Sequence, residues 1–245
     1  MAVVVLARPE RRNAFSAAML ADLADAVENV VSDPGVRAVA LVSEGGAFSV
    51  GADVYEFGDN LDQGSMTERV LGNVELMNPV VAAIVDLAVP TVAGIDGVAA
   101  GAGLALALAC DIRIGGPECS FIPAFVGVGI PPDSGASWLL ERAVGRGQAT
   151  DILLRNRKVA AQEALALGLI TQLVDEPRVR AVAVAAELAS GPPTALAATK
   201  QLARRPRDTL AERMTAERTA LEASLATSEP AEGIRAFLER RAPAW

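Results

Sequence analysis

The 245-residue sequence contains no histidine, a single tyrosine and only two cysteines. Without histidine, neither a Ser-His-Asp nor a Cys-His catalytic system can form. A histidine-ligated zinc site is equally excluded, and two cysteines cannot make a structural zinc site alone. Acid–base chemistry must therefore come from carboxylates, from Tyr55, from Cys110 or Cys119, or from one of the lysines, Lys158 and Lys200.

Basic residues and long apolar runs are also scarce. The 22 basic residues are outnumbered by 30 acidic ones, so the net charge of −8 argues against nucleic acid or an anionic membrane as the main partner. The apolar stretch Gly97–Cys110 is shorter than the roughly 20 residues that a membrane helix needs. The first residues lack the basic-then-apolar order of a signal peptide, so we expect a cytoplasmic protein whose cysteines are reduced core thiols.

The patterns that are present favour an α/β fold. Ala2–Leu6 and Val36–Val42 have the composition of strands, and Ala17–Val31, capped by Ser16, has helical spacing of apolar residues. With a further strand at Thr91, a parallel sheet follows. We expect Ser43–Gly58 to be a loop and Met66–Leu87 to be a helix kinked near Pro79. Short strands are expected at Asp111–Ile114, Cys119–Phe121 and Ile170–Val174. Further helices are expected at Ser134–Val144, Gly147–Arg155, Ala160–Ala166, Pro177–Ala189, Pro193–Leu202, Asp208–Leu225 and Ala231–Arg240.

The segment Thr91–Asp111 combines a strand, a glycine-rich turn at Gly97–Gly103 and a buried helix at Leu104–Cys110. A turn of this kind at a helix N-terminus offers free N–H groups to an anion. The glycines are equally explained by close packing of helix and sheet. A dinucleotide fingerprint would need glycine where Leu106 stands. The remaining interpretation is an oxyanion site at the amide of Ala102, which requires a second donor elsewhere.

The sequence as a whole resembles the crotonase family, also called the enoyl-CoA hydratase/isomerase family. The motifs that carry the resemblance follow one another along nearly the whole chain: Arg8-Pro9-Glu10-Arg11-Arg12-Asn13-Ala14-Phe15-Ser16, Ala47-Phe48-Ser49-Val50-Gly51-Ala52-Asp53-Val54, Gly97 to Asp111, Gly145-Arg146 with Ala161-Glu163-Ala164-Gly168-Leu169, and Glu232-Gly233-Ala236-Phe237.

The resemblance implies a spiral of strand–strand–helix turns that binds an acyl-CoA thioester, in trimers or paired trimers. It implies a ββα core over residues 1–191 and a helical trimerisation or lid region over residues 192–245. The family's two oxyanion amides map onto Ala52 and Ala102. The substrate-binding positions that the resemblance implies are Arg11, Arg12, Ala14, Gly51, Asp53, Gly101 and Phe125, of which the arginines would grip the CoA moiety. Singly, either arginine is equally explained as part of a solvated turn, and Phe237 as a core residue or as part of an adenine pocket.

The sequence departs from the family's hydratases at both catalytic glutamates, because Ala105 and Phe125 occupy their positions. One carboxylate remains nearby, Asp133, in a Pro-Asp-Ser-Gly motif that resembles the phenylacetate-pathway ring-opening isomerase and dienoyl-CoA isomerases. A single base can remove a proton from one carbon and return it to another, and the apolar residues around it would raise its pKa. The alternative is that Asp133 only caps the helix that follows.

We therefore predict an acyl-CoA isomerase that uses Asp133 and needs no metal or redox cofactor. Two alternatives stay open: a hydratase with a displaced carboxylate such as Glu56 or Glu75, and a non-catalytic acyl-CoA binding protein. Asp59 lies in the same loop as Glu56 and is a weaker candidate, and Tyr55 either bonds substrate or packs. The expected assembly is a homotrimer or a dimer of trimers, with a small-molecule substrate as the partner.

Overall fold

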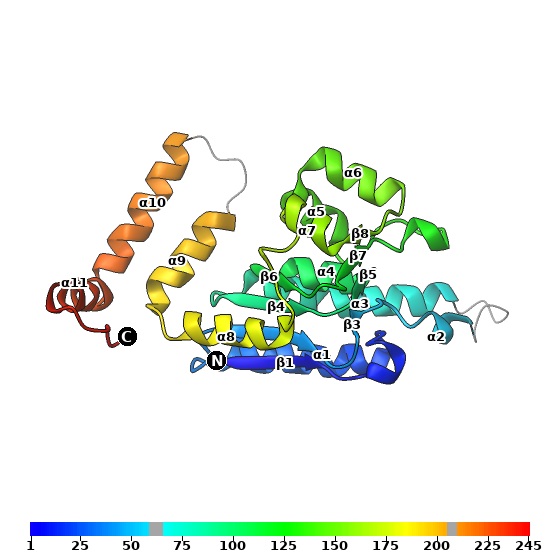
Figure 1. The fold of residues 1–245 in the computed structure, drawn as a ribbon, viewed down its shortest axis with the longest axis horizontal. Coiled ribbons are helices and arrows are strands. Elements are labelled where there is room, and N and C mark those ends of the chain that lie inside the picture. Colours follow the sequence, from blue (N-terminus) through cyan, green and yellow to red (C-terminus); the bar gives the residue numbers. More distant parts are fainter. Residues whose placement is uncertain (59–65, 205–209) are drawn as a thin grey trace.

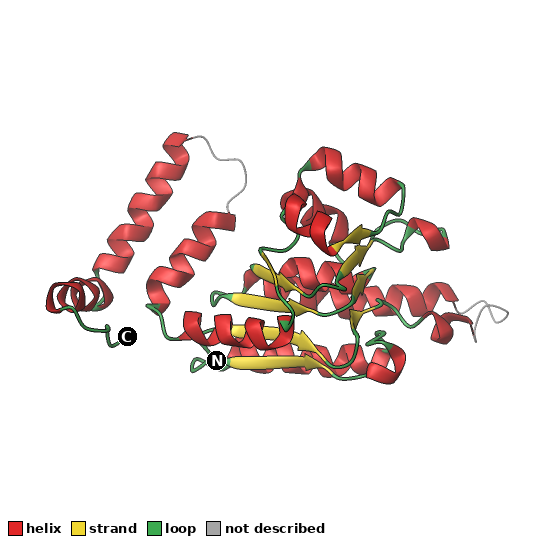
Figure 2. Ribbon diagram, viewed as in Figure 1, coloured by secondary structure: helices red, strands yellow, loops and turns green. Residues whose placement is uncertain are grey.

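The computed structural model describes residues 1–58, 66–204 and 210–245, and it contains two β-sheets flanked by helices (Figures 1 and 2). The first sheet is wholly parallel and has five strands, in the spatial order β1 (Ala2–Leu6), β2 (Val39–Ser43), β4 (Thr91–Ile95), β6 (Ile112–Gly115) and β9 (Gln172–Leu173). The second sheet has the order β3 (Ala47–Ser49), β5 (Val98–Ala100), β7 (Ser120–Ile122) and β8 (Val159–Ala160). The predicted α/β class and parallel sheet are confirmed.

The chain passes from one sheet to the other and then into a helix, three times in succession. β2 and β3 precede α2 (Val54–Gly58) and α3 (Met66–Asp86), β4 and β5 precede α4 (Ala102–Ala109), and β6 and β7 precede α5 (Ala136–Val144). This repetition is the strand–strand–helix spiral that the resemblance implied. The other helices are η1 (Pro9–Arg11), α1 (Ala17–Ser32), η3 (Val126–Val128), α6 (Arg146–Leu154), α7 (Ala161–Leu167), α8 (Pro177–Ala189), α9 (Pro193–Arg204), α10 (Leu210–Leu225) and α11 (Glu229–Glu239).

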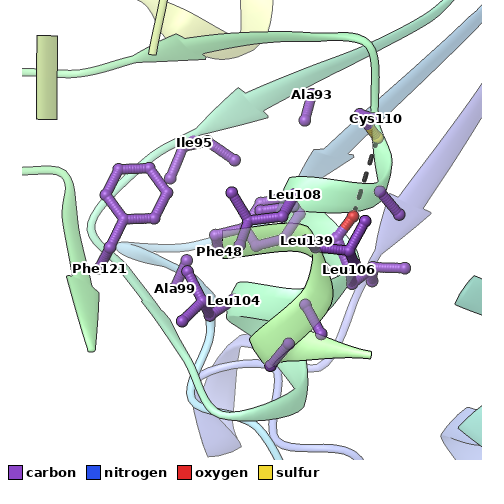
Figure 3. Close-up of a cluster of buried hydrophobic side chains, with 14 of the residues drawn as sticks. Phe48, Ala93, Ile95, Ala99, Leu104, Leu106, Leu108, Cys110, Phe121 and Leu139 are labelled. Carbon is purple, nitrogen blue, oxygen red and sulfur yellow. Dashed lines mark hydrogen bonds between the residues drawn. The ribbon is translucent and has the colours of Figure 1, made fainter. Parts of the chain in front are cut away.

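The main core surrounds α4, which has buried side chains on every face after its first residue. Its side chains Leu104, Leu106 and Leu108 pack with Phe48 and Phe121 from the second sheet (Figure 3). Each buried leucine or phenylalanine contributes about 1.5–3 kcal/mol relative to an exposed one. The first turn of α4 is therefore held firmly in place at the edge of the second sheet.

Helix α4 ends in a buried thiol. The Sγ atom of Cys110 lies 3.9 Å from the carbonyl oxygen of Leu106 (dashed in Figure 3). Burial raises the pKa of the Cys110 thiol to about 12, and that of Cys119 to about 11. Both cysteines are buried and free, as the sequence predicted.

Helix α8 covers the outer face of the first sheet, whereas α9, α10 and α11 stand at the far end of the molecule from α2 (Figure 1). An ionic cluster fixes α9: the Asp111 carboxylate lies 2.9 Å from Lys200 Nζ and 2.6 Å from Arg204 Nη2. The same carboxylate accepts hydrogen bonds from the amide and hydroxyl of Thr91, both at 2.8 Å. The domain division at residue 191 stays a prediction.

In the described part of the chain, no single helix is long and apolar enough to cross a membrane. Together α8 and α9, bent by 116° at their junction, meet the length and composition criterion.

Three local expectations were wrong. The predicted loop Ser43–Gly58 contains β3 and α2, and the predicted turn Gly97–Gly103 contains β5. Strand β2 begins at Val39 rather than Val36, because the amide of Val36 closes a turn onto the Asp33 carbonyl. Strands β3 and β5 were missed because a three-residue strand has too few positions to show a period of two.

Candidate functional site

Two loops meet at the carboxyl ends of β3 and β5. These strands are parallel neighbours in the second sheet, with Ala47 opposite Val98 and Ser49 opposite Ala99. Since parallel strands end at the same edge of a sheet, the segments that follow them, 50–53 and 101–102, lie next to each other. The arrangement brings together the two predicted oxyanion amides, which are 50 residues apart in the sequence.

Both amides are available to a ligand. In the bridge between Phe15 and Ala52, the Phe15 amide donates to Gly51 O at 2.8 Å and the Asp53 amide donates to Phe15 O at 3.0 Å. The Ala52 amide therefore points to the other side of this segment. Ala102 is the first residue of α4, so its amide has no helical partner. Within the described residues, neither amide donates a hydrogen bond.

Glycines allow the two loops to approach closely. Gly51 has φ of +84°, and a Cβ atom there would lie 2.8 Å from Ala100 O and 3.3 Å from Ala102 N. Gly101 has φ of +53°, and its amide donates to the Ile122 carbonyl at 3.1 Å. A side chain at Gly51 would thus collide with the second loop and cover its amide.

An ion pair between the buried Asp53 and the partly buried Arg8 anchors the first loop. The Asp53 side chain is 3% exposed and accepts a hydrogen bond of 2.7 Å from Arg8 Nη1. Ser49 Oγ donates to the Asn13 carbonyl at 2.7 Å and accepts from the Gly51 amide at 3.1 Å. The loop is therefore held from both sides by the turn that follows β1.

The predicted CoA-binding residues lie on that same turn. Arg11 and Arg12 are exposed, whereas Ala14 is buried and its carbonyl accepts a hydrogen bond of 2.9 Å from Arg8 Nη1. The Arg11 guanidinium carbon lies 5.3 Å from the ring centroid of Tyr55, which is on α2. This cation–π contact joins the basic turn to the helix that follows the first loop.

Asp133 lies on the loop that leads into α5, and it does not cap that helix. The N-cap of α5 is Gly135, with no side-chain hydrogen bond, and the helix begins at Ala136 rather than at the expected Ser134. Asp133 Oδ1 instead accepts a hydrogen bond of 2.8 Å from Ser134 Oγ. Burial raises the pKa of the Asp133 carboxyl above its usual value, and this hydrogen bond partly offsets the rise. The capping interpretation was therefore wrong.

Apolar residues occupy the positions of the two family glutamates. Ala105 is completely buried in α4, one turn after Ala102. Phe125 is also buried and immediately precedes η3, and its carbonyl accepts the Ile130 amide at 3.2 Å. Neither side chain can hold a water molecule by hydrogen bonding.

The other carboxylate candidates are less well placed. Glu75 is exposed on α3, and Glu56 is partly buried on α2 with its amide bonded to Asp53 O at 3.0 Å. Asp59 lies outside the described residues. Among the described residues, no group of three histidine, cysteine, aspartate or glutamate side chains could hold a metal ion.

A large groove of about 1340 Å³ lies away from the two amides, between α9, α10 and the segment 34–37. None of the predicted catalytic or substrate-binding residues lines this groove. The close approach of the two loops, rather than the size of a cavity, therefore marks the candidate active site.

Sequence reasoning gave no individual role to Arg8, Asn13 or Ser134. Arg8 and Asn13 were visible only as part of a motif, and their partners lie 31 to 45 residues away along the chain. Asn13 has φ of +56°, which asparagine tolerates better than most residues, but the sequence alone does not show that the turn needs it. For Ser134, the sequence feature that could have been used is its hydroxyl group, which stands next to the candidate base Asp133.

Comparison with known proteins finds similar sequences and similar structures over nearly the whole chain. The family described as enoyl-CoA hydratase/isomerase matches residues 1–245. The chain is 37% identical to a probable enoyl-CoA hydratase of Rhodobacter capsulatus, over 99% of this chain and 93% of the relative. It is 34% identical to the 1,2-epoxyphenylacetyl-CoA isomerase of Escherichia coli, over 98% and 92%. A crystal structure of an enoyl-CoA hydratase/isomerase from Mycobacterium abscessus, 35% identical, superposes with a TM-score of 0.94 over 99% of this chain and 94% of that one.

Proposed function

The chain belongs to the enoyl-CoA hydratase/isomerase family, and from that premise we propose that it is an acyl-CoA isomerase. The thioester carbonyl oxygen of the substrate would bind between the Ala52 and Ala102 amides. Asp133 would take a proton from the carbon next to the carbonyl and return it farther along the acyl chain. The observation that carries the proposal is a pair of amides that donate no hydrogen bond within the described residues, in a chain that keeps Asp133 but has buried apolar residues at both glutamate positions.

Each proposed group has a distinct task. The two amides stabilise the negative charge that arrives on the carbonyl oxygen when the proton leaves. Removing one such donor in other enzymes lowers kcat about 10²- to 10³-fold. The Asp133 carboxylate, whose pKa is raised by burial, is a stronger base than a solvated aspartate. The step uses only main-chain amides and one side chain, so we propose no metal or redox cofactor.

The apolar residues at the two glutamate positions favour isomerisation over hydration. Adding water across a double bond requires a group that activates the water and a group that delivers the proton. Ala105 and Phe125 can do neither. Binding of the CoA moiety is assigned to Arg11 and Arg12, whose exposed guanidinium groups suit phosphate, and to the backbone near Ala14.

Hydration is the second candidate because relatives with 37% and 38% identity are named probable enoyl-CoA hydratases. It would require Glu56 or Glu75 to act on water. Glu75 is exposed, whereas Glu56 follows the first loop directly on α2. Substitution of each glutamate by glutamine tests this route without changing the length of the side chain.

The direct test is to assay purified protein on 3-enoyl-CoA, dienoyl-CoA, 1,2-epoxyphenylacetyl-CoA and 2-enoyl-CoA thioesters. We expect a double-bond shift or ring rearrangement by the wild type and its loss in Asp133→Asn. Rapid hydration of 2-enoyl-CoA, or full isomerase activity in Asp133→Asn, would refute the assignment. Glu56→Gln and Glu75→Gln serve as controls and should retain isomerase activity.

We further propose that the protein assembles as a homotrimer or as a dimer of trimers. Helices α10 and α11 expose large apolar side chains that the described residues leave uncovered, among them Leu210, Met214, Leu221, Leu225, Ile234, Phe237 and Leu238. An apolar face of this kind marks an interface. Sedimentation equilibrium should give a mass three or six times that of the chain, and a monomer at micromolar concentration would contradict the proposal.

A further inference from the structure

Ser134 has a backbone conformation that serine rarely adopts. Its φ is +51°, in the left-handed region, and the next residue, Gly135, has φ of +74°. The turn into α5 therefore needs two left-handed residues in succession, but only the second is glycine. Glycine at position 134 would satisfy the same turn without steric strain. A non-glycine residue in such a position suggests that its side chain has a use.

Among the described residues, the side chain of Ser134 has one hydrogen-bond partner, and that partner is the proposed base. Ser134 Oγ donates to Asp133 Oδ1 at 2.8 Å, and Ser134 is only 4% exposed. The backbone of the turn is closed separately by the Ala136 amide, which donates to the Asp133 carbonyl at 2.9 Å. The hydroxyl is therefore not needed to close the turn.

We propose that Ser134 is a positioning residue, which holds the Asp133 carboxylate in one orientation through its buried hydroxyl. The inference rests on the proposed function in that it takes Asp133 as the proton-transferring group. With Oδ1 engaged by Ser134, the second oxygen, Oδ2, is left for the substrate. An aspartate without this hydrogen bond would rotate about its side-chain bonds and would present either oxygen.

The hydrogen bond also affects the ionisation of the base. Burial raises the pKa of Asp133, and the Ser134 hydroxyl lowers it in part, because a donor stabilises the charged carboxylate. No charged side chain contributes to this shift among the described residues of the surrounding elements. The charged groups there are Glu68, Arg69, Glu75 and Asp86 on α3 and Glu141 and Arg142 on α5, while α4 carries none.

Two variants distinguish the effect of the Ser134 hydroxyl from the effect of the backbone strain. Ser134→Gly removes the donor and relieves the left-handed strain, whereas Ser134→Ala removes the donor and keeps the strain. Ser137→Ala is the matched control, since Ser137 is an exposed serine on the first turn of α5. The two Ser134 variants should differ in thermal stability but should behave alike in catalysis.

The readout is the pH dependence of kcat/KM for the best substrate of the isomerase panel. Activity requires ionised Asp133, so it falls as the pH drops through the pKa of that carboxyl. Loss of the donor should move this acidic limb upward by about one pH unit in both Ser134 variants. At high pH, where Asp133 is ionised in every variant, we expect a loss of kcat of less than about tenfold, set by orientation alone. Ser137→Ala should follow the wild type.

A titration that does not depend on activity distinguishes failure of this inference from failure of the proposed function. The carboxyl resonance of Asp133 in protein labelled with ¹³C-aspartate is assigned by its absence in Asp133→Asn. Its pKa should be higher in Ser134→Gly than in the wild type. An unchanged titration or a superimposable pH profile would overturn the role of Ser134. Full activity of Asp133→Asn would instead overturn the role of Asp133 as the base.

Discussion

Substitution of Gly51 by alanine tests the oxyanion pair most directly. The new Cβ would lie 2.8 Å from Ala100 O, closer than real Cβ atoms approach an oxygen, and 3.3 Å from Ala102 N. It would therefore cover the Ala102 amide or push the two loops apart. Loss of one oxyanion donor corresponds to about 2.7–4 kcal/mol of barrier, so we expect kcat to fall about 10²- to 10³-fold.

The same substitution also affects stability, and a control separates the two effects. Alanine in a left-handed conformation costs about 1–2 kcal/mol, and the steric overlap adds about 1–3 kcal/mol. Gly145→Ala is the control for substitution of a glycine with positive φ: Gly145 has φ of +78° and ψ of 157°, a region that costs a non-glycine residue about 1–3 kcal/mol, but nothing lies within 4 Å of its Cβ position. Gly145 joins α5 to α6, away from the two loops.

The assay measures kcat at a temperature where urea titration shows both variants to be folded. Gly145→Ala should lose about 1–3 kcal/mol of unfolding free energy and keep its kcat. Gly51→Ala should also lose stability, and it should lose nearly all activity. A kcat for Gly51→Ala within threefold of the wild type would refute the assignment of the Ala102 amide to the oxyanion site, as would an equal loss in both variants.

Three further predictions follow from the ionisable groups. Asp133→Asn should unfold at a higher temperature than the wild type at pH 7, because the raised pKa of Asp133 makes stability fall as the pH rises from the unfolded-state pKa through the folded one. In differential scanning calorimetry, the difference in unfolding temperature between variant and wild type should grow as the pH rises from 4 to 8, and a constant difference would contradict the prediction. Asp53→Asn removes the shorter of the two ion pairs of Arg8 and leaves only the exposed Glu10 at 3.9 Å, so it should lower the free energy of unfolding in urea by about 1–3 kcal/mol. It should also lower kcat, because Asp53 adjoins the proposed oxyanion amide of Ala52; unchanged values for both would contradict the anchoring role. Cys110 and Cys119, with pKa values raised to about 12 and about 11, should resist iodoacetamide at pH 8 in the folded protein and react in urea, as intact-mass spectrometry would show.

The longer elements of the fold could be predicted from the sequence because their patterns are strong. The strand at Thr91, predicted from its β-branched run, is β4 (Thr91–Ile95), and the predicted helix Pro177–Ala189 has the bounds of α8. The three-residue strands β3 and β5 were missed because they are short. Those two strands place the two loops next to each other, so the residues alone indicated an oxyanion site at Ala102, whereas its partner Ala52 was found only through the family resemblance.

The contacts that support the site were beyond sequence reasoning for a different reason. Arg8 and Asp53 are 45 residues apart, and nothing in the local sequence of either one indicates the other. The left-handed conformation of Ser134 is similarly hidden, since the local sequence alone predicts a helix starting at that residue. Only the packing of the loop against the body of the protein decides that the helix starts two residues later, at Ala136.

At the two glutamate positions of the family, this protein has apolar residues that belong to its buried core, so more has changed than a single side chain. Ala105 is completely buried in a helix whose neighbours already fill the space around it, between Leu104 and Leu106. A glutamate there would introduce both extra volume and a charge that has no counter-ion, and each is costly in a close-packed interior. Phe125 fills the other glutamate position with a buried ring. The same packing that holds Ala102 at the start of α4 therefore excludes water-activating groups from these two positions. The arrangement favours proton transfer by one carboxylate.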